Sequence, residues 1–286
     1  MKHSFRMWCL SVMSIIALLA LAAATYAWFS SNRKVSTSTA TARTGDETLE
    51  LQISSSGGGG FRDNEKVSIA QVNQTDAKEL LPVSTNDLSN FVYSPVTMDG
   101  KASVFKPVEN ESNYYHGRVY LRAVGDGWSS GSKMDLYLDE TDGVFGSASR
   151  GNLLTATRLG LKFDGKSPVI LKLSDSSSPK ANQVYNTVVG GVTLGANQVL
   201  SSNGSRVKAV KDPSKLISDY TIGFDGGSLQ IPKEPLISMD FNKIYAVDIY
   251  FYLEGCDPDC SDAISFDESD LYLGFYGVLN EGASRS

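Results

Sequence analysis

The strongest constraint on the fold is a two-residue apolar period that recurs along the chain, while no helical period is sustained beyond the N-terminus. Leu49, Leu51 and Ile53 alternate with polar residues, as in a strand with one buried face. Other alternating or β-branched runs, separated by Gly-, Asp- and Ser-rich turns, span residues 119–124, 134–138, 153–163, 169–173, 245–253 and 271–278. Strands joined by turns, without regular helices between them, predict an all-β fold, an antiparallel β-sandwich of jelly-roll type.

The N-terminus has the layout of an export signal. Lys2, His3 and Arg6 precede an apolar run over residues 8–29, with small residues at its far end. We therefore expect residues 1–27 to form a hydrophobic helix that is cleaved as a signal peptide, after Ala24 or Ala27. The alternative is an uncleaved membrane anchor, because 22 helical residues at ~1.5 Å each just span a bilayer core of ~30 Å. Both interpretations place the body outside the cytoplasm.

The rest of the chain is expected to form one body. Residues 28–48 are Ser/Thr-rich and lack proline, which predicts a flexible arm, and residues 49–280 are expected to form the β-sandwich domain. Residues 281–286 are expected to be a disordered tail. Four consecutive glycines at 57–60 predict a flexible loop that does not bind phosphate, because no Lys-Ser/Thr ending follows them.

Charge and histidine content exclude several functions. The chain has 26 basic and 32 acidic residues, and loss of Lys2 and Arg6 with the signal makes the formal net charge of −6 more negative by two. An acidic body is a poor match for nucleic acid or anionic lipid, so we expect membrane contact only through residues 8–29, if they are retained. The histidines are His3 and His116, and we expect His116 to be structural or at the surface, without a carboxylate nearby in the sequence. We expect no catalytic residues and no enzymatic activity.

One motif resembles a serine-hydrolase signature. Residues 127–131 match G-x-S-x-G, but a nucleophile elbow needs a following helix and a later histidine, and no histidine follows His116. The motif instead predicts a glycine-rich loop that carries Trp128. This tryptophan is a candidate contact residue, unless it packs on its own domain.

An acidic stretch surrounds the two cysteines that lie outside the signal. Residues 254–270 hold seven carboxylates and no basic residue, and Cys256 and Cys260 are a candidate disulfide in an exported protein. Calcium is the candidate cofactor, because Asp257, Asp259, Ser261 and Glu268 fall at positions 1, 3, 5 and 12 of an EF-hand loop. Against calcium, Asp262 takes the position that requires glycine and Pro258 interrupts the loop, so a solvated acidic loop is the alternative.

Both ends of the body resemble a known group of proteins. Residues 25–31, Thr-Tyr-Ala-Trp-Phe-Ser-Ser, followed by Thr-Leu-Glu-Leu at 48–51, resemble the N-terminus of the TasA/camelysin group of Gram-positive exported proteins. Residues 245–260 are similar to a closing motif of proteins with this signal type. The resemblance implies that a SipW-type signal peptidase cleaves near Ala27, Trp28 and Phe29. The chain departs from TasA in the Gly57–Gly60 loop, the cysteine pair and the length of its insertions.

The resemblance also implies a function and a location. It implies a jelly-roll domain, secreted or at the cell surface of a Gram-positive bacterium, that contributes to an extracellular, biofilm-type matrix. Better-known relatives polymerise when an N-terminal strand of one subunit completes the sheet of the next. We therefore expect a structural protein that assembles with itself or with related surface subunits, with residues 28–48 as donor strand or as a simple tether. The alternative is a surface adhesin or carbohydrate-binding module, assisted by calcium.

Overall fold

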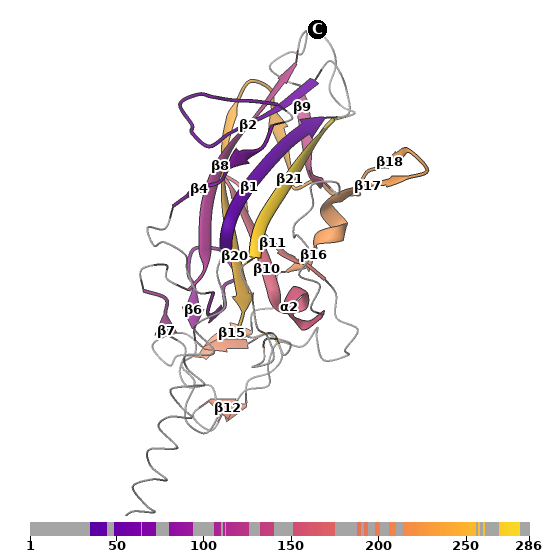
Figure 1. Cartoon of the computed structure of the whole chain (residues 1–286). Helices are drawn as coiled ribbons and strands as arrows, with labels where there is room; N and C mark the ends of the chain where they lie inside the picture. Colours follow the sequence, from indigo (N-terminus) through magenta and orange to yellow (C-terminus); the bar gives the residue numbers. More distant parts are fainter. Residues whose placement is uncertain are drawn as a thin grey trace, which may run out of the picture.

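The computed structural model describes residues 35–44, 49–63, 65–72, 80–93, 106–109, 111, 113–125, 132–139, 151–174, 188–189, 192–193, 198–200, 206–209, 214–255, 257, 260 and 269–280. Most of these residues lie in β-strands, and the long strands form two sheets that pack on one another (Figure 1). The prediction of an all-β fold is confirmed, and the two packed sheets are compatible with a sandwich.

Sheet A has the order β18-β17-β9-β21-β1-β3, with β19 also paired to β9. Its strands are β1 (Val35–Thr44), β3 (Val67–Ser68), β9 (Lys133–Asp139), β17 (Thr221–Asp225), β18 (Ser228–Gln230), β19 (Ile237–Asp240) and β21 (Ser269–Leu279).

Sheet B has the order β16-β11-β10-β20-β8-β2, with β4 paired to β8 and β5 paired to β20. Its strands are β2 (Leu49–Ser54), β4 (Ala70–Gln71), β5 (Pro82–Val83), β8 (Tyr115–Gly125), β10 (Thr157–Phe163), β11 (Val169–Lys172), β16 (Lys215–Leu216) and β20 (Ile244–Glu254).

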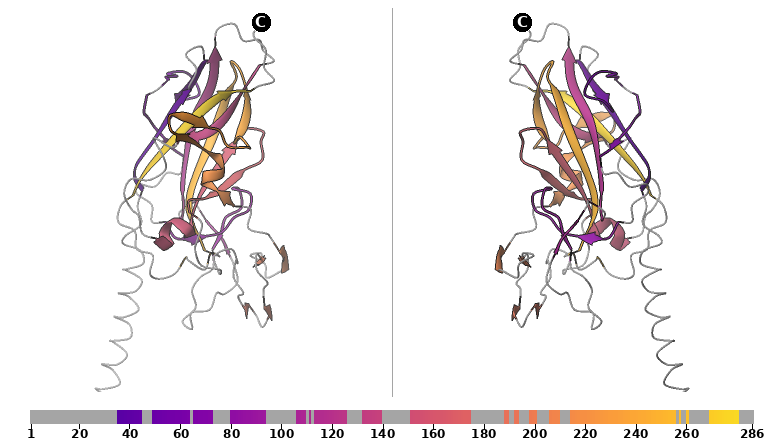
Figure 2. Two further views of the ribbon diagram at one scale, coloured as in Figure 1. Left: turned by 90° about the vertical axis from the view of Figure 1, so that its right-hand side faces the viewer. Right: turned by 90° about the vertical axis from the view of Figure 1, so that its left-hand side faces the viewer.

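Three small hairpins lie outside the two sheets. They pair β6 (Val92–Tyr93) with β7 (Lys106–Pro107), β12 (Val188–Val189) with β13 (Val192–Thr193), and β14 (Gln198–Leu200) with β15 (Arg206–Ala209). The last two hairpins lie beyond one end of the long strands (Figure 2).

The sheets are mixed, which corrects the prediction of a purely antiparallel sandwich. β1 runs parallel to β21, and parallel pairs also join β9 to β17, β11 to β16 and β20 to β5. Period-two patterning indicates which residues share a face, but it carries no information on strand direction. The parallel pairs join segments far apart in sequence, so local turn signals could not predict them.

The main core lies between the two sheets and follows the predicted alternation. Leu49, Leu51 and Ile53 are all buried and pack with inward residues of the neighbouring strands. Leu121 of β8 and Val247 of β20 are fully buried in this core. On each strand, the residues that alternate with the inward-facing ones belong to the outer face of sheet B. The sandwich is therefore stabilised chiefly by apolar side chains on the inner faces of both sheets.

A second apolar cluster covers part of the outer face of sheet B. The segment 80–93 brings Leu88 and Phe91 against Tyr252 of β20, and the rings of Phe91 and Tyr114 stack with centroids 3.8 Å apart. Leu88 lies directly over Gly160 of β10, where an added Cβ would come within 2.5 Å of a Leu88 methyl. Glycine at 160 thus makes room for the covering segment.

Several local expectations are refined. The run at 153–163 begins in helix α2 (Gly151–Ala156), and strand β10 starts only at Thr157. The only other helix in the described part of the chain is the short 3₁₀ helix η1 (Ile217–Tyr220). The glycine loop is also ordered against the sheet, because Gly57 lies so close to Tyr120 that a Cβ there would be 2.8 Å from the ring.

The predicted N-terminal helix of residues 1–27 lies outside the described residues. Among those described, no helix is long and apolar enough to cross a membrane.

Candidate functional site

The N-terminal strand β1 is the most informative feature of sheet A. It pairs with the C-terminal strand β21 over its whole length, from Val35 beside Ser269 to Thr44 beside Gly277 (Figure 1). Residues 28–48 were expected to form a flexible arm, and residues 35–44 instead form this strand. β21 provides hydrogen-bond partners for the main-chain N–H and C=O groups of β1. A polar segment can therefore form this strand without an apolar sequence pattern.

Among the side chains of β1 that the structure describes, those of residues 39, 40 and 42–44, the inward-facing ones contribute little apolar surface. Ala40 and Ala42 point into the core and are buried, with only 1% and 0% of their surface exposed. They lie beside Leu273 and Phe275 of β21 in the register, and these larger side chains fill the core next to them. Because burial energy scales with apolar area, these two methyl groups contribute far less than the Leu, Ile and Phe side chains of the neighbouring strands.

The outer face of β1 carries an ion pair that spans a strand. Arg43 binds Asp139 of β9 with two hydrogen bonds, from Nε to Oδ2 and from Nη2 to Oδ1, the second at 2.8 Å. Since β21 lies between β1 and β9, the Arg43 side chain crosses it, with its guanidinium 5.4 Å from the centre of the Tyr276 ring. The Asp139 side chain is fully buried, so this pair fixes where β1 sits along the sheet.

The other edge of β1 is only partly covered. β3 pairs with Thr39 and Ala40 alone, so residues 41–44 have no described strand on that side. At the end of β1, the Thr44 hydroxyl donates to the Leu49 carbonyl oxygen at 2.7 Å, which draws the two ends of the 45–48 connection together. Among the described strands, β3 alone pairs with this edge of β1, and it does so over two residues.

Most of the predicted site residues lie outside the described residues. These are Ala24, Ala27, Trp28 and Phe29 of the cleavage region, the contact candidate Trp128, the cysteine Cys256, and the calcium candidates Asp259, Ser261 and Glu268. The disulfide and calcium predictions therefore stay predictions.

Two members of the cysteine loop are described. Asp257 is buried, and its Oδ2 accepts a hydrogen bond of 2.6 Å from Arg158 Nη2, a side chain that is also buried. Arg158 donates further to the carbonyl oxygens of Thr155 and Thr157. Cys260 is partly buried, packs against the main core and donates its N–H to the Asp257 carbonyl oxygen. Asp257 thus ties the loop to the start of β10, and among the described residues no group of three or more His, Cys, Asp or Glu could hold a metal ion.

His116 lies in a charged cluster on the outer face of sheet B. Its Nδ1 is 3.1 Å from Glu111 Oε2, and its Nε2 is 3.2 Å from Asp248 Oδ1. Arg118 donates two hydrogen bonds to Asp248, at 2.6 and 3.0 Å. Burial favours the protonated form of Asp248, but the hydrogen bonds from His116 and Arg118 outweigh it and lower its pKa to about 2.

Both ring nitrogens of His116 therefore face carboxylates. The expectation that no carboxylate lies nearby in sequence is wrong, since Glu111 precedes His116 by five residues. Asp248, by contrast, is 132 residues away, and only the antiparallel pairing of β8 with β20 brings it close.

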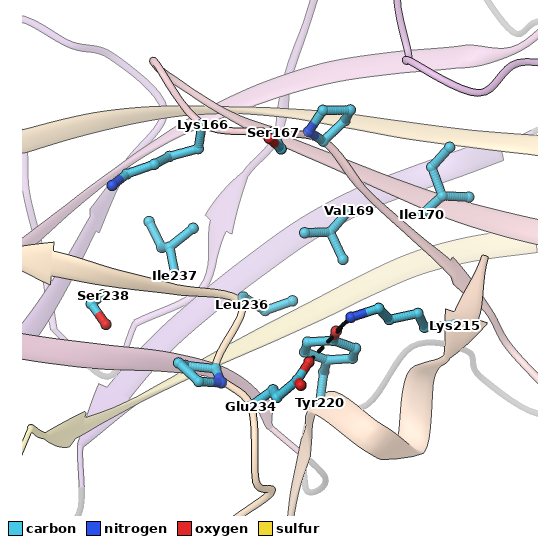
Figure 3. A pocket seen from close by; sticks show the side chains of 12 residues that line it. Lys166, Ser167, Val169, Ile170, Lys215, Tyr220, Glu234, Leu236, Ile237 and Ser238 are labelled. Atoms are coloured by element: carbon cyan, nitrogen blue, oxygen red, sulfur yellow. Dashed lines mark hydrogen bonds and ion pairs between the residues drawn. The ribbon is translucent and has the colours of Figure 1, made fainter. Parts of the chain in front are cut away.

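A cleft of about 430 Å³ opens between the edges of β11 and β19 (Figure 3). Its apolar part is formed by Val169, Leu236 and Ile237. At one side Lys215 Nζ donates to the Tyr220 hydroxyl at 2.5 Å and to Glu234 Oε2 at 3.1 Å. The polar groups on this side therefore pair with one another.

The Arg43–Asp139 pair is not predicted by the sequence patterns. A weak signal was present, because alanines at 40 and 42 repeat with the strand period directly before the lone arginine at 43. The partner could not be identified, since Asp139 lies 96 residues further along the chain.

Comparisons with known proteins add nothing to this geometry. No protein-family model matches the chain, and neither the curated proteins nor the solved structures that were compared with it gave a match.

Proposed function

We propose that the protein is an exported structural protein of a bacterial cell surface or extracellular matrix, and that it assembles into filaments by exchanging β1 between subunits. The observation that carries this proposal is the position of β1 in sheet A, beside β21. β1 is an N-terminal strand held along its whole length by main-chain pairing, and the buried apolar residues among its described side chains, those of 39, 40 and 42–44, are two alanines. The resemblance of the chain ends to TasA-like proteins agrees with it, as does the export signal that the sequence predicts at residues 1–27.

The energetics of exchange favour such a role. When β1 leaves its own sheet and takes the same position beside β21 of a neighbouring subunit, each lost contact is replaced by an identical one, as in domain swapping. Of the apolar area exposed in between, Ala40 and Ala42 contribute only methyl groups. Strand addition recovers its free energy from main-chain hydrogen bonds, which a Ser/Thr-rich segment forms as well as any other.

The Arg43–Asp139 pair would set the register in the exchanged state. A polar donor strand has little side-chain pattern to prevent it from slipping by one or two residues. A buried carboxylate that accepts two hydrogen bonds from one guanidinium is satisfied at one position of β1 only. In the proposed filament, Arg43 of each donor binds Asp139 of its acceptor.

The proposal extends to processing and location. Cleavage near Ala27 by a SipW-type signal peptidase would free the start of the donor strand, while a retained segment 8–29 would keep the subunit at the membrane. The body would then be a jelly roll outside a Gram-positive cell.

Electron microscopy of the purified protein tests the proposal. The full chain is expressed with its own N-terminal segment, beside a variant that lacks residues 28–48. Ala42→Asp places a charge in the core beneath β1, and Thr39→Asp is the matched control on the outer face of the same strand. We expect filaments from the wild type and from the control, and none from the other two variants.

A second measurement separates loss of assembly from loss of folding. A synthetic peptide of residues 35–44 should raise the melting temperature of the variant that lacks residues 28–48, because it fills the empty seat, and a scrambled peptide should not. Monomers from the wild type under all conditions, or filaments from all variants, would contradict the proposal.

A further inference from the structure

The inner faces of β1 and β21 are complementary in size. In the register of the two strands, Ala40 lies beside Leu273 and Ala42 lies beside Phe275. All four residues are at most 1% exposed, and inward side chains of β2 belong to the same cluster. Because a protein core is close-packed, a larger side chain at either alanine would have to displace its neighbours. The space beside β21 at these two positions therefore fits small residues.

The relation is reversed at the C-terminal end of β1. Thr44 lies beside Gly277 of β21, so here the larger residue belongs to β1. A Cβ added at Gly277 would lie 3.3 Å from the Thr44 methyl carbon and would overlap the Met134 sulfur. Glycine at 277 thus leaves room for Thr44. A small residue is paired with a larger one at all three of these positions.

The outer face of β1 adds a charged determinant. Arg43 follows Ala42 directly, and its guanidinium donates two hydrogen bonds to the fully buried carboxylate of Asp139. A lysine ammonium is a point charge and does not reproduce this paired geometry. The segment of β1 that carries these determinants reads Ala-x-Ala-Arg, a sequence that occurs once in the chain, at residues 40–43.

The size and charge determinants specify the same register. A shift by two residues keeps the inner face of a strand inward, so alternation alone does not prevent it. A shift of β1 toward the start of β21 would place Thr44 beside Phe275, where an alanine now lies. A shift the other way would place Ala42 beside Gly277 and leave the space of the Thr44 side chain empty. Either shift moves the Arg43 Cα by ~7 Å along the sheet and so breaks its paired hydrogen bonds.

We infer that the position beside β21 selects its donor strand by size and charge: it takes a strand with small residues at the places of Ala40 and Ala42 and an arginine directly after them. This inference rests on the proposed exchange of β1 and names the partner for it, β1 of a second copy of the chain. In strand addition, main-chain hydrogen bonds supply affinity and the side-chain positions supply specificity. Exclusion of larger side chains keeps other polar strands out.

The expected selection is opposite to that of simple apolar burial. Leucine at position 42 offers more apolar area than alanine, so burial alone would make a donor with leucine bind more tightly. A close-packed position makes the same donor bind more weakly. One substitution therefore separates a specific fit from nonspecific hydrophobic association.

Trapping of synthetic peptides on the full chain tests the selection. The acceptor is the full chain with Tyr272→Cys, and the donors are peptides of residues 35–44 with Thr39→Cys, since Thr39 and Tyr272 are in register. Each peptide carries its sulfur in a mixed disulfide with nitrothiobenzoate. When a peptide replaces β1, the thiolate at position 272 attacks the peptide sulfur, and the coloured thiobenzoate leaves with the electron pair. The chain without Tyr272→Cys measures the background from the native cysteines.

The peptide with the natural inner face should label position 272 above this background. Ala42→Leu and Arg43→Lys in the peptide should each lower the labelling rate at least about tenfold. Ala42→Gly keeps the residue small and should lower the rate by no more than about fivefold, as expected for glycine in a strand. Because the substitutions compared are all in peptides, none of them can unfold the acceptor.

The outcomes separate this inference from the proposed function. Filaments with equal labelling by all peptides, or faster labelling by the leucine peptide, would overturn the inference and leave the exchange of β1 standing. No labelling by any peptide would overturn the inference too, and an absence of filaments in the same preparation would then contradict the proposed function as well.

Discussion

At the scale of single residues, the fold depends on charged groups that are buried in pairs. Arg158 and Asp257 are both almost fully buried, and they join the start of β10 to the loop that follows β20. Asp139 is likewise buried and joined to Arg43. In each case the pair connects segments about a hundred residues apart, so removal of one partner leaves an uncompensated charge inside the protein.

Loss of the Asp257 charge should strongly destabilise the folded protein. Asp257→Asn leaves the Arg158 cation without its carboxylate, and we expect the free energy of unfolding to fall by about 3 kcal/mol. Urea denaturation followed by tryptophan fluorescence measures this change. Glu65→Gln, which breaks the exposed Arg62–Glu65 pair, is the control and should leave the curve unchanged. A loss for Asp257→Asn no larger than that of the control would show that the buried pair is not needed.

The Asp248 cluster predicts a particular acid sensitivity. Its pKa is lowered from 3.8 to about 2, so the charged carboxylate stabilises the folded state above pH 3.8 and this contribution is lost as the pH falls towards 2. The shift corresponds to about 2 kcal/mol. Asp248→Asn should therefore be less stable than the wild type at pH 7, with the difference shrinking between pH 4 and 2. Stability curves that stay parallel through this range would contradict the assignment.

At the scale of elements, the covering of sheet B depends on a glycine that only the tertiary structure explains. Gly160 lies in the middle of β10, where glycine is unfavourable for a strand, and its missing side chain accommodates Leu88 from the segment 80–93. The outer face of sheet B is apolar at that position because the segment covers it. β10 and the segment 80–93 therefore pack closely because residue 160 has no Cβ.

Substitution at this position should separate the cover from the sheet. Gly160→Ala forces Leu88 to move, and we expect a loss of about 1–3 kcal/mol, with faster hydrogen exchange in residues 83–92 than in β10 itself. Gly58→Ala is the matched control, because a Cβ there meets only the Ser56 hydroxyl at 3.8 Å. Equal effects of the two substitutions would mean that the close approach at Gly160 is unimportant.

At the scale of the whole molecule, the sequence predicts those strands that bury large apolar side chains of their own in the core. Leu49, Leu51 and Ile53 show their buried face by alternation, and β2 forms where that pattern predicts it. β1 has no such pattern, because the buried residues among its described side chains are alanines and its place depends on β21, more than 220 residues away. The parallel direction of the β1–β21 pairing likewise depends on this distant strand. Long-range partners such as Asp139 for Arg43 and Asp248 for His116 follow from the topology of the sheets, which period-two patterning does not encode.

The central claim, that β1 passes from one molecule to the next, can be tested with one covalent bond. Thr39 of β1 is in register with Tyr272 of β21, so cysteines at both positions join the strands wherever β1 is seated. After oxidation of the assembled Thr39→Cys/Tyr272→Cys chain, a non-reducing denaturing gel shows whether the bond lies within or between chains, with Thr39→Cys alone as control. We predict a ladder of covalent multimers for the double variant and none above the dimer for the control. A single monomer band from the double variant would contradict the account, because it would place each β1 in its own sheet.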